Sequence, residues 1–289
     1  MTWIIAVAVI AVLGYLLDRE IYFYEGVHLG PRLQAWLYDR WSRKYDEGKR
    51  ASQLRDDEML AQPLLDLLKN VPEPFVLDFA TGTGRLSYAL ISRSEFRGHI
   101  IALDLSQGML EEAAAKLYLR AERSAVEAID EGSRSAVGVE LLRHLSLPLP
   151  FPDAAFDVVC ALEVLELFPD PDAPLHELTR VLRSGGVLLT SRGTEESGRK
   201  AKVKSAKAFT SLLERQGLEQ IHIKKWWKLF DRVIAAKRGS SAPVGMQSLS
   251  DVLKCSSCGH IRWEKTTSAW ECQTCGKELS ITNEKIVLN

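Results

Sequence analysis

The sequence lacks internal repeats, and it has no low-complexity tract apart from a short run of Gly, Ser, Ala, Pro and Val at residues 239–245. The composition is 46% hydrophobic and 26% charged. These values are typical of a protein with a packed core and exclude a disordered or fibrous chain. A length of 289 residues accommodates one α/β domain of ordinary size with smaller attachments.

The sequence also lacks an excess of positive charge. Its formal net charge is -1, whereas broad nucleic-acid binding needs a dense surplus of Lys and Arg. Cysteine is scarce as well. Of five cysteines, four form two close pairs near residue 265, a pattern that indicates metal ligation in a reducing compartment rather than a disulfide framework. The fifth, Cys160, lies in an apolar run and is predicted to be a small core residue.

Residues 3–17 form an unbroken apolar run with no Lys or Arg before it and no evident cleavage site. As a helix the run would be about 22 Å long, against a hydrocarbon core of about 30 Å. Arg and Lys gather after it, which by the positive-inside rule puts the remainder at the cytoplasmic face. We therefore expect a single N-terminal membrane anchor, a transmembrane helix of marginal length. The alternative is a buried helix of the soluble domain.

Strand and helix patterns alternate in the middle of the chain. Apolar strands are predicted near residues 75–79, 100–104, 137–142, 156–162, 187–191, 219–224 and 229–237. Helical patterns separate most of them, which predicts an α/β fold: a Rossmann-like, seven-stranded, mostly parallel sheet with helices on both faces. The chain then divides into an apolar helix (1–20), a helical lead-in (21–70), this α/β domain (71–238), a linker (239–250) and a small unit (251–289).

A glycine-rich turn follows the first of these strands. Residues 76–86 read Val-Leu-Asp-Phe-Ala-Thr-Gly-Thr-Gly-Arg-Leu, an apolar strand that enters a Gly-x-Gly turn before a helix. Glycine lets a ligand approach the backbone closely, and the free N–H groups of the turn favour a carboxylate or phosphate. A nucleotide-binding fold would offer the same turn, so this motif alone leaves the ligand open.

An acidic residue at the end of the second strand narrows the choice. Asp104 follows Ile-Ile-Ala-Leu, 20 positions beyond Gly84. A carboxylate there is placed to accept both ribose hydroxyls of an adenosine cofactor. Alone, Asp104 would equally suit a helix N-cap, but together with the glycine turn it indicates cofactor binding.

Residues 38–237 resemble the class I S-adenosylmethionine-dependent methyltransferases, and most closely the ubiquinone and menaquinone biosynthesis group. Ordered motifs carry the resemblance: residues 76–84, the segment Leu-Asp-Leu-Ser-Gln-Gly-Met-Leu at 103–110, residues 149–159 and residues 177–187. The resemblance implies S-adenosyl-L-methionine as methyl donor. It implies that Asp78, Gly82 and Gly84 hold its methionine end, that Asp104 takes the ribose, that Met109 lies near the adenine, and that Tyr45 helps to cover the pocket. Ala80 and Leu105, within the same motifs, are expected to bind the cofactor as well.

Two positions depart from the family pattern. An acidic residue that often contacts the adenine amine should fall near residue 144, where this chain has His144 and Leu145. Residues 163–170 resemble the Glu-x-x-Glu-His segment of quinone O-methyltransferases, but Leu167 replaces the histidine. The usual base or metal ligand is therefore missing. Glu163, at the end of the fourth strand, is the leading candidate for a catalytic group, with a solvated carboxylate or helix cap as the alternative.

The small unit carries two matching knuckles, Cys-Ser-Ser-Cys-Gly at 255–259 and Cys-Gln-Thr-Cys-Gly at 272–276. Each directs two thiolates at one ion, and together they predict a zinc ribbon with a structural Zn²⁺ held by Cys255, Cys258, Cys272 and Cys275. Zinc ribbons bind RNA, DNA or protein, and the sequence does not distinguish these partners.

Three hypotheses of function remain. The first is methyl transfer to a small-molecule or lipid-like, quinone-type acceptor at the cytoplasmic face of a membrane. The second is an RNA methyltransferase whose ribbon recognises nucleic acid. The third is a non-catalytic, membrane-tethered scaffold, against which the intact glycine turn and Asp104 argue. The apolar N-terminus and near-neutral charge favour the first.

Overall fold

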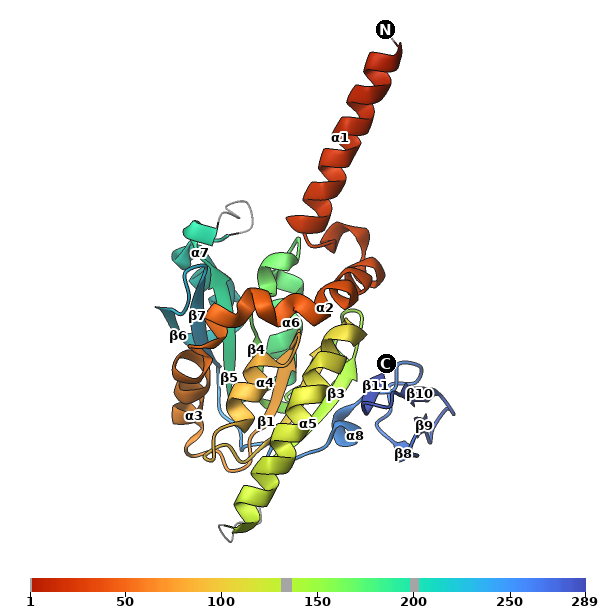
Figure 1. Cartoon of the computed structure of the whole chain (residues 1–289). Helices are drawn as coiled ribbons and strands as arrows, with labels where there is room; N and C mark the ends of the chain where they lie inside the picture. The colour runs from red at the N-terminus through yellow and green to blue at the C-terminus, as the bar shows by residue number, and fades with distance from the viewer. Residues whose placement is uncertain (1, 131–136, 198–202) are drawn as a thin grey trace.

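The computed structural model describes residues 2–130, 137–197 and 203–289 (Figure 1). Its first part is helical. The elements are α1 (Thr2–Tyr22), the 3-10 turn η1 (Val27–Leu29), α2 (Pro31–Gln53), the π-helical turn η2 (Asp57–Ala61) and α3 (Gln62–Leu68). Proline at the first position of α2 fits the helix start, because its missing N–H would have no partner there.

The α/β domain follows the predicted alternation. Its elements are β1 (Phe75–Phe79), α4 (Arg85–Ile91), β2 (His99–Asp104), α5 (Gln107–Asp130), β3 (Gly138–Arg143), β4 (Phe156–Ala161), η3 (Leu165–Leu167), α6 (Asp172–Val181), β5 (Leu182–Gly193), η4 (Glu195–Ser197), α7 (Ala206–Arg215), β6 (Leu218–Lys225) and β7 (Phe230–Lys237). All seven predicted strands are present. The remaining elements are α8 (Leu249–Val252), β8 (Trp263–Lys265), β9 (Ala269–Cys272), β10 (Glu278–Ile281) and β11 (Ile286–Leu288).

The prediction of a seven-stranded sheet is wrong in the number of strands. Within the part of the chain that the structure describes, eleven strands form one mixed sheet in the order β6-β7-β5-β4-β1-β2-β3-β11-β10-β9-β8. Strand β11 pairs with the edge strand β3 in parallel, so the four-cysteine unit (residues 251–289) continues the sheet. An edge strand presents unpaired N–H and C=O groups that another strand can satisfy, and sequence patterns do not reveal which strand does so.

Helices cover both faces of the sheet. One apolar cluster joins α3, α4 and α5 to the sheet, with Leu64, Leu90 and Leu117 in its core. The other joins α6 and α7, and it continues into α8 and the four-cysteine unit through Trp270 and Leu279. Cys160 is fully buried, as predicted. Parallel strands buried on both faces place the ends of β1, β2, β3 and β4 together at one edge, where ligands of such sheets bind.

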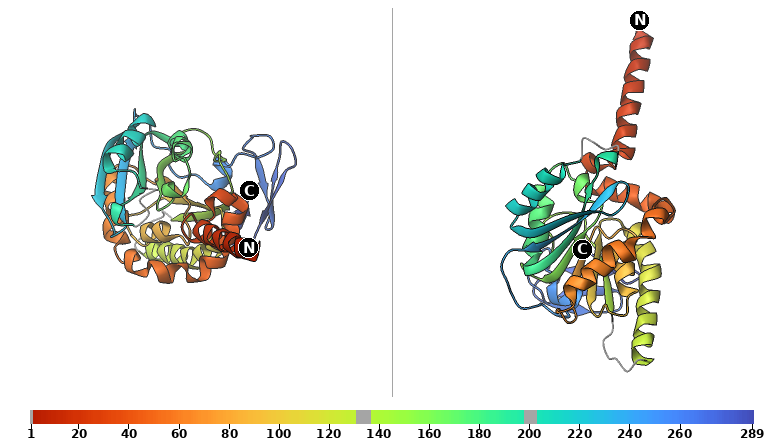
Figure 2. Two further views of the ribbon diagram at one scale, coloured as in Figure 1. Left: turned by 90° about the horizontal axis from the view of Figure 1, so that it is seen from above. Right: turned by 90° about the vertical axis from the view of Figure 1, so that its left-hand side faces the viewer.

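Helix α1 projects from the rest of the chain (Figures 1 and 2). Its apolar side chains are exposed on every side, including Trp3 at 83%, Ile10 at 68% and Leu17 at 55%. The alternative of a buried helix is therefore wrong. Among residues 2–130, 137–197 and 203–289, no helix is long and apolar enough to cross a membrane. The expected transmembrane helix is corrected on this point, because the apolar run stops at Leu17 and the helix continues with the charged residues Asp18, Arg19 and Glu20.

Candidate active site and metal site

The glycine turn after β1 has the backbone that its sequence predicts. Ala80, Gly82 and Gly84 all have positive φ, at 54°, 56° and 76°. A Cβ on Gly84 would lie 2.8 Å from Leu117 Cδ1, so this glycine allows α4 to pack against α5. A Cβ on Gly82 would meet nothing within 4 Å, so its backbone faces open space. Gly84 therefore serves packing, while Gly82 is the glycine available to a ligand.

The carboxylate of Asp78 holds this turn in place through hydrogen bonds. It is buried, and one carboxylate oxygen accepts hydrogen bonds from Thr81 Oγ1 at 2.7 Å and Ser87 Oγ at 2.6 Å. Burial raises the pKa of Asp78, and the two hydroxyl bonds oppose that rise. The resemblance implied that Asp78 holds the cofactor, but in this structure its hydrogen bonds hold the turn to the first residues of α4.

Asp104 lies at the matching end of β2, beside the turn. Its Oδ2 accepts the Gly82 N–H at 2.8 Å, and its Oδ1 accepts the Ser106 N–H at 2.9 Å. Burial raises the pKa of Asp104 to about 6, against the lowering effect of these backbone bonds. The parallel register of β1 and β2 brings together the two motifs that sequence analysis linked by spacing.

A cavity of about 340 Å³ opens at this edge of the sheet, a size within the range of small-molecule sites. Tyr45, Ala80, Gly82, Asp104, Leu105, Met109 and Glu163, all predicted as site residues, line it. Its other walls are largely apolar and come from Val27, Pro31, Leu147, Leu167 and Phe168. Asp78 lies outside this lining but lines a smaller adjoining hollow with Lys49 and Arg85.

Helix α2 covers the site and is held there by polar contacts. Asp39 Oδ1 accepts hydrogen bonds from Gly108 N at 2.8 Å and Ser106 Oγ at 2.6 Å, at the start of α5. Tyr38 and Tyr45 belong to this helix and line the cavity. Burial raises the pKa of both phenols, so both stay neutral hydrogen-bonding groups at ordinary pH.

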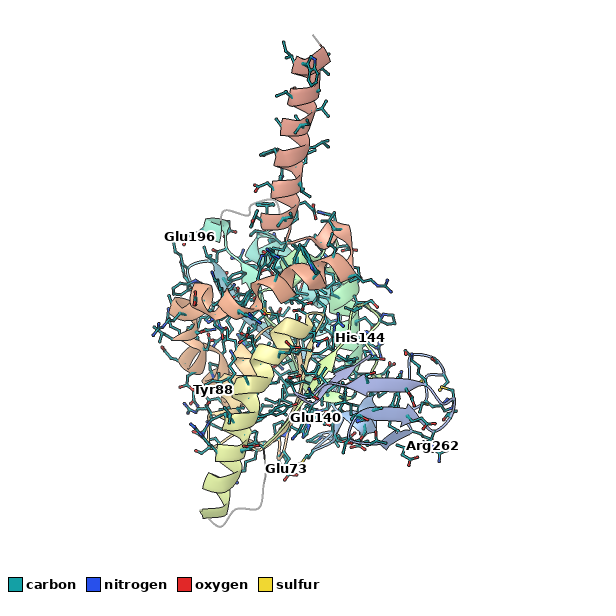
Figure 3. All side chains as sticks on the ribbon, turned by 45° about the vertical axis from the view of Figure 1, so that its right-hand side comes forward. Glu73, Tyr88, Glu140, His144, Glu196 and Arg262 are labelled. Atoms are coloured by element: carbon teal, nitrogen blue, oxygen red, sulfur yellow. The ribbon has the colours of Figure 1, made fainter. Side chains whose placement is uncertain are left out.

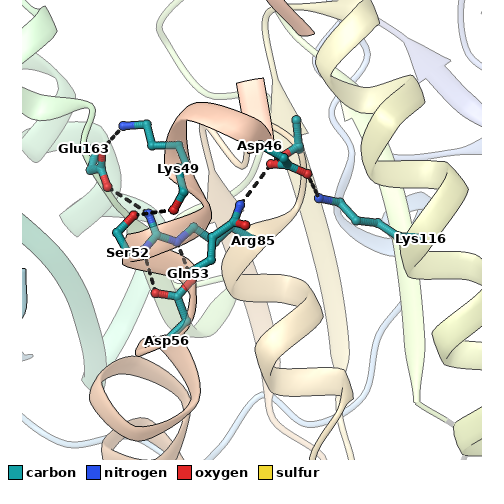
Figure 4. A network of polar contacts seen from close by, with 9 residues as sticks. Asp46, Lys49, Ser52, Gln53, Asp56, Arg85, Lys116 and Glu163 are labelled. Atoms are coloured by element: carbon teal, nitrogen blue, oxygen red, sulfur yellow. Dashed lines mark hydrogen bonds and ion pairs between the residues drawn. The ribbon is translucent and has the colours of Figure 1, made fainter. Parts of the chain in front are cut away.

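Glu163 belongs to an ion-pair network between α2, α4 and the end of β4 (Figure 4). One of its oxygens pairs with Lys49, and the other accepts from Arg85 Nη1 at 3.0 Å. Arg85 also forms a two-bond pair with Asp56. The exposed fractions of the Arg85 and Glu163 side chains are only 13% and 12%. Both carboxylate oxygens of the candidate catalytic residue are therefore already engaged by cations.

A second pair of contacts extends the network along α2. Asp46 accepts from Thr83 Oγ1 at 2.6 Å and pairs with Lys116 at 2.6 Å (Figure 4). Sequence analysis missed Lys49, Arg85 and Asp46. For Asp46 and Lys49 the signal was their three- and four-residue spacing with Gln53, which places all three on one face of α2. Arg85, the first residue of α4, had no such signal.

The four predicted metal ligands lie together at one end of the four-cysteine unit. All four Sγ atoms fall within 4.8 Å of one another, and Cys255–Cys275 and Cys258–Cys272 are each 3.6 Å apart. Tetrahedral Zn–S bonds of about 2.3 Å require sulfur atoms about 3.8 Å apart. Gly259 and Gly276, at φ 75° and 71°, close two matching turns around the site. The residues thus fit a tetrahedral zinc ion.

Residues 77–190 match the family model described as a methyltransferase domain. Two curated relatives are demethylmenaquinone methyltransferases, from Lactobacillus johnsonii at 29% identity and Thermobifida fusca at 31%. The matches cover 55% of this chain in both cases, and 61% and 60% of the relatives. This chain therefore spans about three-fifths of the length of these relatives. A solved S-adenosylmethionine-dependent methyltransferase from Aquifex aeolicus is 21% identical, covers 68% of this chain and 97% of its own, and gives a TM-score of 0.49.

Residues 77–190 thus match a methyltransferase domain, as the ordered motifs predicted, and the chain is similar to enzymes named as methyltransferases. The family model covers the glycine turn, Asp104 and Glu163 in one stretch. It ends before the four-cysteine unit and begins after α2.

Proposed function

We propose that this protein transfers the methyl group of S-adenosylmethionine to a lipophilic small-molecule acceptor of the quinone type. The observation that carries the proposal is the cavity, which Asp104 and Gly82 line together with the apolar residues Val27, Leu167 and Phe168. A lining of this mixed character suits a polar cofactor together with an apolar ring. The names of the curated relatives support the quinone class.

The cofactor would be held by three groups of residues. Asp104 would accept the ribose hydroxyls, and Leu105 and Met109 would contact the nucleoside. In the smaller hollow, Lys49 and Arg85 supply positive charge for the methionine carboxylate, and Asp78 and Glu163 supply negative charge near its ammonium. S-adenosylmethionine supplies an electrophilic methyl carbon, so the protein's task is to align the acceptor and exclude water.

The acceptor should be nucleophilic without losing a proton to a base of the protein. Glu163 is tied to Lys49 and Arg85, and the buried phenols of Tyr38 and Tyr45 have raised pKa values. None of these groups is well suited to remove a proton at neutral pH. We therefore favour an acceptor that is ionised by itself, such as an acidic ring hydroxyl or the ring carbon it activates, with Glu163 as a positioning residue rather than a base.

Helix α1 supports delivery of this acceptor from a lipid surface. Its apolar residues surround the helix, whereas association with a second copy would need only a single stripe. Arg19 lies in its last turn, and Arg32, Arg40, Arg43 and Lys44 follow the helix. Anionic headgroups attract such charges. Val27 and Pro31, directly after α1, line the cavity. A molecule dissolved in the bilayer would thus meet the cavity at the base of α1.

A labelled-methyl assay tests the proposal. Purified protein and S-adenosylmethionine labelled in the methyl group are incubated with lipid extract, with soluble metabolites and with RNA. Label should enter the organic-extractable lipid fraction and disappear with Asp104→Ala, but persist with the exposed variant Asp66→Ala. Label confined to RNA would show that the acceptor is RNA and not a lipophilic small molecule. Absence of label from all fractions, together with no cofactor binding, would refute the proposed methyltransferase activity.

A further inference from the structure

We propose that the four-cysteine unit shapes the cofactor pocket, so that metal binding by its cysteines strengthens S-adenosylmethionine binding in that pocket. The inference rests on the proposed cofactor site. Its starting point is the wall segment, residues 144–147, which directly follows β3 and lines the cavity. Asn289, the residue after β11, is the positioning residue that we assign to this wall.

Strand β11 continues the sheet beside the wall segment. Ile286, Val287 and Leu288 pair with Leu141, Leu142 and Arg143 of β3. The next residue, Asn289, donates its backbone N–H to the Arg143 carbonyl at 3.1 Å. Its side-chain amide nitrogen lies 3.2 Å from His144 Nδ1. The unit therefore contacts the first residue of the wall through both backbone and side chain.

The contacts of His144 fix its orientation. Its Nε2 lies 3.2 Å from the Pro148 carbonyl, which can only accept, so Nε2 carries the proton and Nδ1 accepts from the Asn289 amide. Burial lowers the pKa of His144, which favours this neutral form. The His144 backbone N–H donates to the Asp104 carbonyl at 3.0 Å. His144 thus lies between Asn289 and the residue proposed to bind the ribose.

The unit also holds the chain just after the wall segment. The Lys254 N–H donates to the Pro150 carbonyl at 2.8 Å. In the linker just before the unit, the Leu249 N–H donates to the Glu140 carboxylate of β3 at 2.6 Å. Figure 3 shows Glu140 and His144 on the side of the domain that carries the unit. Leu149 and Phe151 belong to the same apolar cluster as Trp270 and Leu279. Both ends of the wall are therefore fastened to the unit.

The metal ligands connect to these contacts through short strands. Cys272 ends β9, which pairs with β10, and β10 pairs with β11 through Ser280–Leu288 and Ile281–Val287. A unit of this size cannot keep its fold by apolar burial alone, so metal loss should release β11 from β3. The wall would then lose Asn289. Coupling free energies between sites usually change affinity about 5- to 150-fold, and we expect a loss in this range.

Calorimetry of S-adenosylmethionine binding to the full chain tests the coupling in zinc-loaded protein, in chelated protein and in zinc-loaded Asn289→Ala. The control is Asn283→Ala, an exposed position in the same unit. Chelation and Asn289→Ala should each weaken binding at least about fivefold, and Asn283→Ala should not. Hydrogen exchange should accelerate at residues 143–148 in both weakened samples, and circular dichroism should show Asn289→Ala to be folded. By reciprocity, S-adenosylmethionine should raise zinc affinity by the same factor.

The outcomes separate this inference from the proposed function. If the loaded, chelated and Asn289→Ala proteins all bind the cofactor with equal affinity, the coupling is refuted and the methyltransferase function stands. If only chelation weakens binding and Asn289→Ala behaves as Asn283→Ala, the assignment of Asn289 is refuted. If the loaded protein binds no S-adenosylmethionine, both the coupling and the proposed function fail.

Discussion

The backbone N–H of Gly82 donates to the carboxylate of Asp104 over 2.8 Å, which joins the loops after two neighbouring parallel strands. The Asp104 carboxylate accepts the Gly82 N–H on Oδ2 and the Ser106 N–H on Oδ1, and the Leu105 backbone N–H also contributes. Because a carboxylate has about four lone-pair sites, Asp104 keeps capacity for a further donor. A ribose hydroxyl supplies such a donor, so this relationship makes Asp104 the most direct residue with which to test the cofactor site.

Asp104→Ala should weaken S-adenosylmethionine binding by about 2–3 kcal/mol, because hydrogen bonds to a charged acceptor contribute this much. Isothermal calorimetry measures the change. Asp66→Ala, on the exposed side of α3, is the matched control and should bind as the unchanged chain does. Equal affinity in both variants would contradict the assignment of Asp104 to the ribose.

Cofactor affinity should fall below pH 6. Burial raises the pKa of Asp104 to about 6 in the folded protein, and ribose hydroxyls donate to the ionised form. Binding therefore favours deprotonation, and affinity should drop about tenfold per pH unit below that pKa. The free energy of unfolding of the ligand-free protein should change in the opposite direction. Because the pKa of Asp104 in the folded protein lies above that of an unfolded Asp, the fold should lose stability as pH rises from about 4 to 6. Calorimetric titration with the cofactor across pH 4.5–8, on the unchanged chain and on Asp104→Ala, checks the affinity trend. Thermal unfolding of the two ligand-free proteins over the same range checks the stability trend. An affinity that does not change with pH would contradict the first, and equal pH dependence of unfolding in the two proteins would contradict the second.

Glu163→Gln distinguishes a positioning residue from a general base. If Glu163 only orients Lys49 and Arg85, the amide keeps one acceptor and methyl transfer should persist at about a tenth or more of its rate, with an unchanged pH profile. Cofactor affinity should fall modestly. A general base would instead show a loss of about 100-fold or more in kcat and loss of the acidic limb of the pH–rate profile, where the base is protonated. Glu214→Gln, on α7, serves as the surface control.

Full-length protein should sediment with vesicles of phosphatidylcholine and phosphatidylglycerol, and removal of residues 1–17 should abolish this binding. The melting temperature should change by no more than about 2 °C, because α1 is not packed against the domain. Ile10→Lys should weaken vesicle binding, since a lysine in apolar lipid costs about 3 kcal/mol. Leu54→Lys, at a position that is 83% exposed after α2, is the matched control. Full-length protein that remains wholly in the supernatant would rule out the lipid contact.

Metal analysis of purified protein should find one zinc per chain, because four thiolates close a tetrahedral shell. Cys272→Ser should lose the metal. Cys160→Ala changes a buried cysteine outside this cluster and should retain it. An iron–sulfur chromophore, or equal metal content in the two variants, would refute the structural zinc site.

Local patterns accounted for most of the α/β domain. The run at residues 156–162 is buried on both faces, and such a run can be read from hydrophobicity alone. The Gly-x-Gly turn and Asp104 are likewise encoded within short segments. Their proximity followed from the parallel sheet, because the ends of parallel neighbouring strands meet at one edge.

Other parts of the site depend on contacts between distant segments. Lys49 and Glu163 are 114 residues apart, and neither carries a local signal of the other. Whether Glu163 is free or paired decides its chemistry, so its proposed role changed only when the ion-pair network was known. The apolar run of α1 was evident in the sequence, but its exposure was a property of packing, since the same residues would also suit a buried helix.

The sequence by itself determined the class of domain, the glycine turn, the acidic end of β2 and the two cysteine pairs, because each depends on residue types within a few positions of one another. Tertiary structure alone decided that β11 completes the edge of β3 and that Asn289 meets His144. Strand addition is mediated by backbone groups that every residue carries. The partner of an edge strand is therefore set by where the whole chain brings it, and not by the side chains of either strand.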